Sequence, residues 1–340
     1  MSSSRQNLSD GYVPLYHIRT DLALEAQEVV QQQSAEEIPG LSSETLQENG
    51  IAINRLEIES EEASQKLGKS RGRYLTFEVP GLRRKDAALQ DRLSEIMARE
   101  LVPFLQLPPN LNQSVLVVGL GNWNVTPDSL GPKVIEELLV TRHAVATGQN
   151  ILGEGFRAVC ALSPGVLGTT GIETGEIISA LVQRIRPALV IVIDALAARR
   201  LERLHTTIQV ADSGISPGSG VGNNRMAINR QTLGIPTIAV GVPTVVDAST
   251  IAGEAFDALA EHFKKDARGH ALGNVMRDFD WEQRRHLITE VLEPYAGGRL
   301  MVTPKDTDAF VEDLAYVISA ALNAALHPRV HSEGSEKYLQ

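Results

Sequence analysis

The stretch SVLVVGLGNWNVTPDSLGP, residues 114–132, determines the fold that the sequence predicts. Its apolar run at residues 115–118 is too short for a helix and is bounded by glycine, which is typical of a strand buried on both faces of a parallel sheet. The chain then passes through an Asn- and Pro-containing loop to Asp128, and Pro132 suits the first turn of the next helix. Catalytic groups collect where the strands of an open α/β sheet end, and Asp128 occupies such a position.

Apolar patterns of the same kind recur along the chain and predict four more core strands. Helical patterns alternate with or follow them, which favours right-handed crossovers and a mainly parallel sheet. The predicted fold class is therefore α/β, with a three-layer α/β/α arrangement. The predicted strands lie at residues 157–162, 188–193, 206–211 and 236–242, and the predicted helices at 177–185, 247–262, 281–292 and 307–326.

The first hundred residues have a different pattern and predict a small N-terminal β/helix accessory region. Residues 51–58 and 73–79 alternate apolar and polar side chains, as antiparallel strands do. Residues 86–104 carry apolar side chains at helical spacing. The Gln-, Ser- and Glu-rich segment 31–48 is interpreted as a linker or loop.

Composition limits the class of protein. The 340 residues are 43% hydrophobic and 22% charged, which is typical of a soluble globular protein, and the net charge of −10 argues against direct nucleic-acid binding. The single cysteine, Cys160, excludes an internal disulfide and fits a reducing compartment, and its apolar neighbours favour a buried hydrophobe over a nucleophile. Because no signal peptide and no apolar run of about 20 residues occurs, we expect an intracellular protein that does not bind a membrane.

Several familiar motifs are incomplete. Gly119 and Gly121 begin a dinucleotide-binding pattern, but its third glycine position is Asn124 and the loop that follows is too long for a phosphate-binding turn. Ser216 and Ser219 lie in a glycine-rich loop without the strand–turn–helix setting of a nucleophile elbow. The metal-binding spacings H-E-x-x-H and C-x-x-C do not occur in the sequence.

Acidic residues near the predicted strand ends are the remaining chemical signal. A lone aspartate there is most often a helix cap or turn residue. Asp194 fits that interpretation least, because it follows the strand core at 190–193 and precedes helix formers at 195–198, so the strand is expected to end at Asp194. Two neighbouring carboxylates raise one pKa and provide an acid and a base that activate water, as in aspartic peptidases. The acids at such positions are Asp128, Asp194, Asp212 and Asp247.

Several segments of the sequence resemble the bacterial spore germination protease family. They are HIRTDLA, GLGNWNVTPDSLGP, LLVTRH, SPGVLGTTGIET, VIDALAAR, DSGISPGSGVGNNR, GVPTVVDA and LMVTPKD, and the similarity extends from about Tyr16 to His327. Family members degrade the small acid-soluble proteins of spores, are made as inactive zymogens and form homotetramers. The resemblance implies that Asp128 and Asp194 are the catalytic pair, that no cofactor is needed, and that the protein is located in the cytoplasm of the forespore, the later spore core.

The same resemblance predicts where the zymogen is processed. Family members cut between an acidic residue and a hydrophobic residue that is followed by alanine, and Asp21-Leu22-Ala23 has this order. Substrates of the family usually have an acidic residue three positions before the one that precedes the cut bond. This chain has Ile18 there, so slow cleavage is expected. The resulting divisions are a propeptide (1–21), an accessory region (22–110), a catalytic core with C-terminal helices (111–327) and a polar tail (328–340).

Two alternatives remain open at this point. A metal-dependent peptidase similar to the hydrogenase maturation proteases would use the same carboxylates as ligands, together with His143. A non-enzymatic nucleotide-binding module would use the interrupted glycine pattern. For the aspartic mechanism, backbone N–H groups of the glycine loops at 165–175 and 214–222 are candidates to stabilise an oxyanion, and the sequence does not assign the acid and the base.

Overall fold

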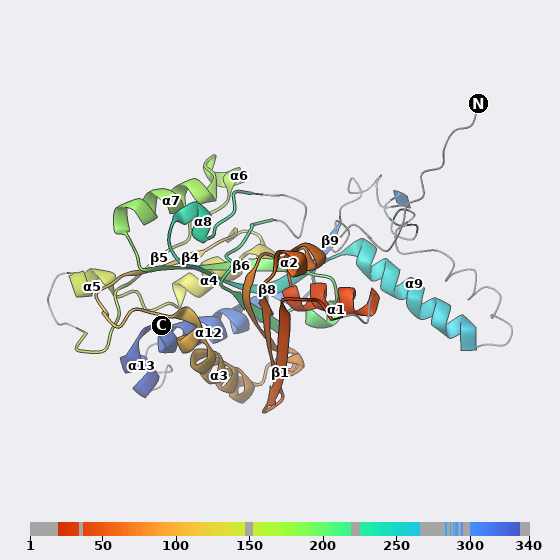
Figure 1. Cartoon of the computed structure of the whole chain (residues 1–340), viewed down its shortest axis with the longest axis horizontal. Coiled ribbons are helices and arrows are strands. Elements are labelled where there is room, and N and C mark those ends of the chain that lie inside the picture. The colour runs from red at the N-terminus through yellow and green to blue at the C-terminus, as the bar shows by residue number, and fades with distance from the viewer. Residues whose placement is uncertain are drawn as a thin grey trace.

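The computed structural model describes residues 20–33, 37–146, 152–218, 225–265 and 300–333, together with separate positions between 283 and 294. The predicted helix at 281–292 therefore lies largely outside the described residues, as do most of the predicted propeptide and the end of the polar tail. The described elements are arranged around one sheet (Figure 1).

This sheet has nine strands within the described part of the chain. Its order is β1-β2-β3-β7-β8-β6-β4-β5, and β9 pairs additionally with β8. The strands are β1 (Leu41–Glu48), β2 (Ile51–Ile58), β3 (Gly72–Glu78), β4 (Val115–Gly119), β5 (Val159–Leu162), β6 (Leu189–Ala198), β7 (Thr207–Ala211), β8 (Thr237–Asp247) and β9 (Met301–Val302).

The parallel part of the sheet confirms the predicted α/β class. β5, β4, β6 and β8 pair in parallel. β7 runs antiparallel to β8, and β3, β2 and β1 continue the antiparallel pairing, so the strands of the predicted accessory region belong to the same sheet. β7 reverses direction because only residues 199–206 connect it to β6, whereas a parallel crossover needs a dozen or more residues.

Helices cover both faces of the parallel strands and complete the three layers (Figure 1). On one face, apolar residues of three helices form a large core with the sheet, including Met97, Leu314 and Val117. On the other face, Ile178 and Val190 belong to a second, smaller core. The first face carries α3 (Ala87–Leu105), α4 (Leu130–Glu136) and α12 (Thr307–Leu326), and the second carries α7 (Thr174–Ile185) and α8 (Arg230–Leu233).

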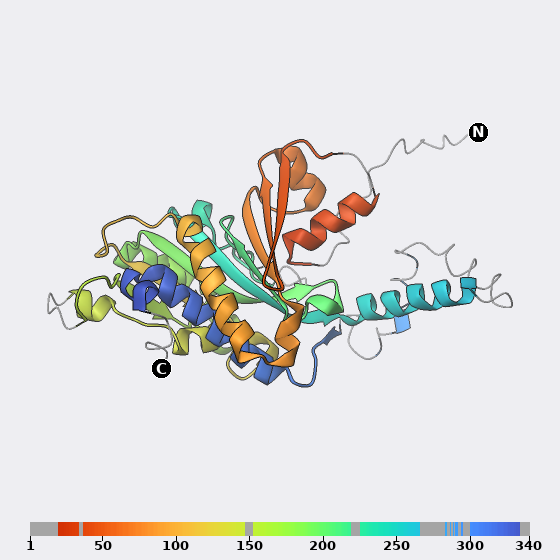
Figure 2. The same cartoon turned by 90° about the horizontal axis from the view of Figure 1, so that it is seen from below.

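The antiparallel end of the sheet carries two helices of its own. α1 (Ala23–Gln33) and α2 (Glu61–Leu67) pack on β2 and β3, where Leu56 and Tyr74 join their apolar residues in a separate cluster. Figure 2 shows this unit standing beside the parallel core, with α9 (Ala248–Lys265) extending away from the sheet. The remaining described elements are η2 (Pro80–Arg84), η3 (Thr126–Asp128), α5 (Arg142–Ala146), α6 (Leu167–Thr170), η4 (Leu201–Arg203) and α13 (Pro328–Glu333).

Two local predictions were wrong. β6 continues past Asp194, because Ala197 and Ala198 pair with β8, and this pairing overrides the helix propensity of the alanines. Residues 41–48 form β1 instead of a linker. The residues at 42–47 are exposed, so β1 lacks apolar alternation and is a strand only because it pairs with β2.

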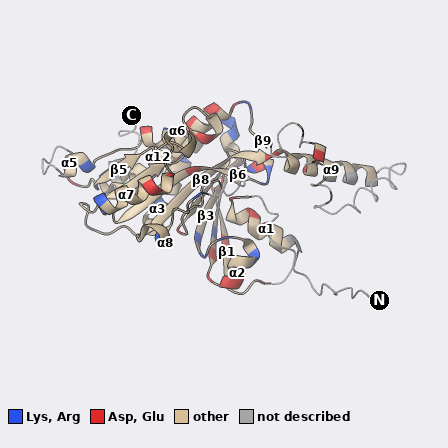
Figure 3. Ribbon diagram, turned by 90° about the horizontal axis from the view of Figure 1, so that it is seen from above, with Lys and Arg blue, Asp and Glu red and all other residues tan. Residues whose placement is uncertain are grey.

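Helix α12 is the described helix that is long and apolar enough, by length and composition, to cross a membrane. In the structure 67% of its apolar window is buried inside the protein. Its residues Val311, Leu314 and Val317 belong to the large core, so α12 is a core helix. Figure 3 shows Lys and Arg residues interspersed with Asp and Glu residues over the described elements.

Candidate active site

Asp128 lies in a short helix, η3, that is packed closely against the end of β4. Gly121 has a φ of +114°, and a Cβ at this position would lie 1.9 Å from the carbonyl oxygen of Asp128. At Gly119 a Cβ would lie 2.2 Å from the carbonyl oxygen of Gly131. The glycines of this turn therefore allow η3 and α4 to approach the strand end, and this close packing is the role that the structure gives them.

Hydrogen bonds connect this turn to the neighbouring strand β6. The Asn122 N–H donates to the carbonyl oxygen of Asp128 at 2.9 Å, and the Leu120 N–H donates to the carbonyl oxygen of Ile193 at 2.8 Å. Ile193 directly precedes Asp194. Because β4 and β6 are adjacent and parallel, Asp128, which follows β4, and Asp194, which follows the part of β6 that pairs with β4, lie at the same edge of the sheet.

Two threonines hold η3 from the side of β8. The Thr244 Oγ1 donates to the carbonyl oxygen of Pro127 at 2.7 Å, and the Thr303 Oγ1 donates to the carbonyl oxygen of Thr244 at 2.8 Å. Both threonines lie in segments that resemble the family, but their spacing gave no indication of this role. They fix the residue before Asp128 relative to the sheet.

Asp128 and Asp194 line one cavity with a volume of ≈ 780 Å³. Asp194 is 7% exposed, and its Oδ1 accepts the N–H of Ala195 at 2.9 Å. The structure therefore brings the two predicted residues together. The two glycine loops border the same cavity, and their residues that line it include Gly165, Gly168, Gly175, Gly214, Ser216 and Gly218, whereas residues 219–224 lie outside the described residues.

The surroundings of the Asp128 and Asp194 carboxyl groups give them different pKa values. Burial raises the pKa of Asp128 to about 6, against the opposing effect of the Asn122 backbone N–H. Burial, followed by the charges of Asp128 and Asp21, raises the pKa of Asp194 well above its usual range. Because the charge of Asp128 raises the pKa of Asp194, Asp128 ionises first and Asp194 holds its proton more strongly, which provides one base and one acid.

The other two strand-end aspartates have structural roles. Asp212 accepts hydrogen bonds from the backbone N–H and the Nε of Arg73, both at 2.7 Å. Asp247 Oδ1 accepts the N–H of Ser249 at 2.8 Å and its Oγ at 2.6 Å, at the start of α9. Asp247 thus has the helix-cap role that is usual for aspartate, whereas Asp212 forms an ion pair with Arg73 of β3.

The residues invoked for other mechanisms lie elsewhere. His143 belongs to α5, which contacts β5, and it is not among the described residues that line the cavity. No group of three or more His, Cys, Asp or Glu residues within the described ranges is arranged to hold a metal ion. Burial raises the pKa of the Cys160 thiol, which disfavours a nucleophilic thiolate.

Comparison with known proteins identifies the family. The germination protease family model matches residues 19–274 and 265–339. A germination protease of Clostridium tetani is 44% identical over 323 residues, covering 95% of this chain and 99% of that protein. The chain belongs to the germination protease family. A relative from Bacillus licheniformis is 44% identical over 358 residues, covering 95% of this chain and 97% of that germination protease.

Membership of the germination protease family makes the protein a peptidase. Among solved structures, a NiFe hydrogenase maturation protease from Thermococcus kodakarensis matches with a TM-score of 0.25 and 15% sequence identity. That match covers 39% of this chain and 74% of the other.

In this member of the germination protease family, the residues around the predicted processing site lie at the cavity. Asp21 lines the cavity, its N–H donates to the carbonyl oxygen of Ala197 at 2.9 Å, and its Oδ2 accepts the N–H of Ala197 at 2.8 Å. Lys69 Nζ donates to the carbonyl oxygen of Thr20 at 2.8 Å. Because Ala197 is three residues beyond Asp194 in β6, the segment is held next to the candidate catalytic group.

Leu22, on the other side of the predicted bond, belongs to the core. Its side chain is fully buried and forms a cluster with Leu196, Leu204 and Val246. Helix α1 begins at the next residue, Ala23. The predicted bond therefore joins a cavity-lining residue to a residue that is packed in the protein.

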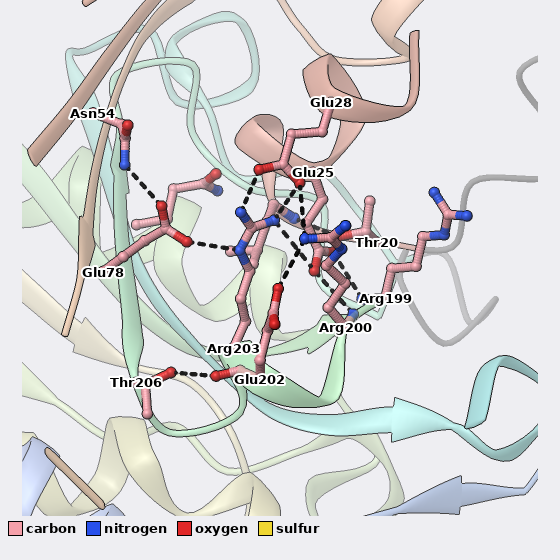
Figure 4. A network of polar contacts seen from close by, with 12 residues as sticks. Thr20, Glu25, Glu28, Asn54, Glu78, Arg199, Arg200, Glu202, Arg203 and Thr206 are labelled. Atoms are coloured by element: carbon pink, nitrogen blue, oxygen red, sulfur yellow. Dashed lines mark hydrogen bonds and ion pairs between the residues drawn. The ribbon is translucent and has the colours of Figure 1, made fainter. Parts of the chain in front are cut away.

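A buried arginine anchors α1 beside the cavity (Figure 4). The side chain of Arg203 is 5% exposed, and its Nη1 and Nη2 bind the two carboxylate oxygens of Glu28 at 3.0 and 2.6 Å. Its Nε binds Glu78 at 2.9 Å, and Glu25 lies 3.6 Å from Nη1. Glu25 also accepts the backbone N–H groups of residues 199 and 200 at 2.7 and 3.0 Å. This network ties the start of α1 to the segment that follows β6.

Lys69 is a cavity-lining cation that the sequence analysis missed. It follows the residue that ends α2, Gly68, whose φ is 62°. Burial lowers the pKa of Lys69, and the charges of Asp21 and Glu25 oppose that effect. A single lysine in a polar loop has no distinctive pattern, so only the fold reveals that it reaches the cavity.

Proposed function

We propose that this protein is an endopeptidase that cuts after acidic residues and initiates the degradation of small acid-soluble spore proteins during germination. One observation carries the proposal: Asp128 and Asp194 line the same cavity, and burial together with the Asp128 charge raises the pKa of Asp194. Membership of the germination protease family supports the substrate class and a location in the cytoplasm of the forespore, which becomes the spore core.

The proposed mechanism is of the aspartic type, without a cofactor. Asp128, the more acidic of the two, removes a proton from a water molecule, whose oxygen forms a bond to the scissile carbonyl carbon. Asp194 gives its proton to the carbonyl oxygen as the C=O bond becomes single. The tetrahedral intermediate then breaks its C–N bond, and the amine leaves with the proton that Asp128 received. As the C=O bond re-forms, the hydroxyl returns its proton to the Asp194 carboxylate. Acid–base catalysis of this kind contributes about 10²–10⁴-fold, so binding and orientation provide the remainder.

Charge and apolar groups at the cavity support the proposed cleavage preference. Lys69 places a positive charge where an acidic residue before the bond would lie, as Asp21 does in this structure. Val125 and Met226 line the cavity with 46% and 38% exposure, and they provide apolar surface for a bound peptide.

The protein is proposed to be a zymogen that cuts its own Asp21–Leu22 bond and releases residues 1–21. The observation that supports this is the place of Asp21 in the cavity, where its charge contributes to the raised pKa of Asp194. While it stays there, the segment occupies the position that a separate substrate needs. Its removal therefore opens the cavity.

Processing predicts a new amino terminus. When the purified full-length protein is incubated, we expect amino-terminal sequencing to show Leu22 as the first residue. The rate at which small acid-soluble spore proteins are cleaved should increase as the processed form accumulates. The Asp194→Asn protein should keep Met1 as its first residue, because the proposed acid is lost. Full activity of a wild-type protein that retains Met1 would contradict the zymogen proposal.

The resemblance to homotetrameric relatives leads us to propose the same assembly here. Light scattering of the purified protein at micromolar concentration is expected to give about four times the chain mass of 36.9 kDa. A stable monomer under these conditions would contradict the assembly without affecting the proposed chemistry.

A further inference from the structure

We propose that Gln209 is a further catalytic residue, whose side-chain amide donates a hydrogen bond to the oxygen of the scissile carbonyl. The inference rests on the proposed function, because it takes the segment around Asp21 as the bound substrate. Gln209 lies in β7, is 7% exposed and lines the same cavity as Asp128 and Asp194.

The contacts of Gln209 lie on both sides of the Asp21–Leu22 bond. Its Nε2 donates to the carbonyl oxygen of Asp21 at 3.3 Å, and this is the oxygen of the bond that would be cut. Its Oε1 accepts the N–H of Ala23 at 2.7 Å. The partners fix the orientation of the amide, because a backbone N–H must face the side-chain oxygen and a carbonyl must face the nitrogen.

The strand register places Gln209 in line with Asp194. Gln209 is opposite Gly241 of β8, and Gly241 is in turn opposite Asp194 of β6. Residues that are directly opposite each other on neighbouring strands point to the same face of the sheet. Gln209 and Asp194 therefore both face the cavity, with Gly241 between them. A Cβ at Gly241 would lie 2.5 Å from the Leu196 side chain, so a larger residue would disturb this face.

This position suits a group that stabilises negative charge on the carbonyl oxygen. When water attacks the scissile carbon, that oxygen gains charge, and an oriented donor in a buried site stabilises it more than it stabilises the ground state. Asp194 supplies the proton in the proposed mechanism, and Gln209 supplies a second hydrogen bond to the same oxygen, which has two lone pairs.

The fold also preserves this donor after processing. Release of residues 1–21 removes the Asp21 carbonyl but leaves Ala23, whose N–H continues to hold Oε1. The Nε2 then faces the open cavity as an oriented donor for the carbonyl group of the next substrate. Gln209 therefore has the same role toward the protein's own chain and toward a separate peptide.

The test replaces Gln209 with methionine, which has a similar shape but neither hydrogen-bonding group. Removal of one oxyanion donor typically lowers kcat by about 10²–10³-fold. We expect Gln209→Met to slow the first-order cleavage of Asp21–Leu22 on the order of 100-fold. After prolonged incubation has completed processing, kcat on a synthetic peptide of residues 16–28 should fall by a similar factor, with KM changed by less than about threefold.

A matched control comes from the same strand. Thr207 points to the same face of β7, is 1% exposed and has a hydroxyl without a hydrogen-bond partner in the described structure. Thr207→Val should cleave at the wild-type rate, and thermal melts verify that each variant is folded. Gln209→Glu adds a second readout, because its activity relative to Gln209→Met should rise as the pH falls and protonation restores a donor.

The outcomes separate this inference from the proposed function. Wild-type rates in folded Gln209→Met protein overturn the role of Gln209, even when processing at Leu22 proceeds. A raised KM with unchanged kcat also overturns it, because Gln209 would then only bind the peptide. If the wild-type protein cuts the peptide but never acquires Leu22 as its terminus, the zymogen proposal fails, and kcat on the peptide alone tests Gln209.

Discussion

Replacement of Asp194 with asparagine is expected to reduce peptide cleavage by about 10³-fold or more and, at the same time, to raise the thermal stability of the protein. The loss follows from removal of the proposed acid, because an asparagine side chain cannot transfer a proton to the carbonyl oxygen. The gain follows because Asp194 is 7% exposed and lies near the charges of Asp128 and Asp21, so that ionisation of its carboxyl group opposes folding.

The sign of the pH effect makes this prediction specific. The pKa of Asp194 is raised in the folded protein above its ordinary value of 3.8, so its contribution to stability is fully present below that pH and is lost as the pH rises. Asparagine does not ionise. The melting temperature of Asp194→Asn should therefore exceed that of the wild type by about 2 °C or more at pH 7, and the difference should shrink toward pH 4.

Two further variants serve as comparisons. Asp128→Asn should also lose cleavage, and the double variant should be little worse than either single variant, because the two groups act as a unit.

With the pKa of Asp128 at about 6, wild-type kcat/KM should rise through that pH as the base ionises. Asp212→Asn, at another strand end, should keep its activity, because Asp212 pairs with Arg73. Substantial activity in folded Asp194→Asn protein would refute the catalytic pair.

The second large effect is expected from Arg203→Met. Arg203 is the buried partner of Glu25, Glu28 and Glu78, and its loss removes the buried cation from beside carboxylates that include Glu25, at 1% side-chain exposure. Breaking a buried ion pair by removing one partner typically costs about 3–5 kcal/mol. We expect a loss of that size in the free energy of unfolding, measured by urea denaturation.

Arg200→Met is the matched control for this prediction. Arg200 is in the same network and pairs with Glu202 at 2.8 Å, but their side chains are 42% and 66% exposed. Exposed ion pairs contribute about 0–1 kcal/mol, so Arg200→Met should change stability little. Equal free energies of unfolding for the two variants would show that the burial of Arg203 does not increase its contribution to stability.

The sequence predicted most elements of the parallel core because their residues carry clear local patterns. The run at 115–118 becomes β4, and helix formers at apolar spacing become α3 and α12. β1 was missed because its exposed polar residues have no apolar period, and its identity as a strand depends on its partner β2. The continuation of β6 past Asp194 was missed because pairing with β8 decides it.

In the candidate site, too, local sequence patterns predicted some residues, and others depend on strand pairing between distant parts of the chain. Asp128 and Asp194 could be selected because each lies near the end of an apolar strand, although only the adjacency of β4 and β6 brings them together. Lys69 and Gln209 could not be selected, since β7 and the loop before β3 reach the cavity through antiparallel pairing that no local pattern specifies. Their roles depend on the sheet order, which involves residues far apart in the chain.

The antiparallel pairing of β3 with β7 also has a consequence for synthesis of the chain. Tyr74 is opposite Ala211, so β3 emerges from the ribosome long before the strand that covers its edge. Until β7 is made, the hairpin and β3 present an unpaired strand edge, which is a site for association with other chains. Such a distant pairing also slows folding, because the long intervening segment must close before the contact forms. The amino-terminal third of the protein therefore completes its sheet only after most of the parallel core has been translated.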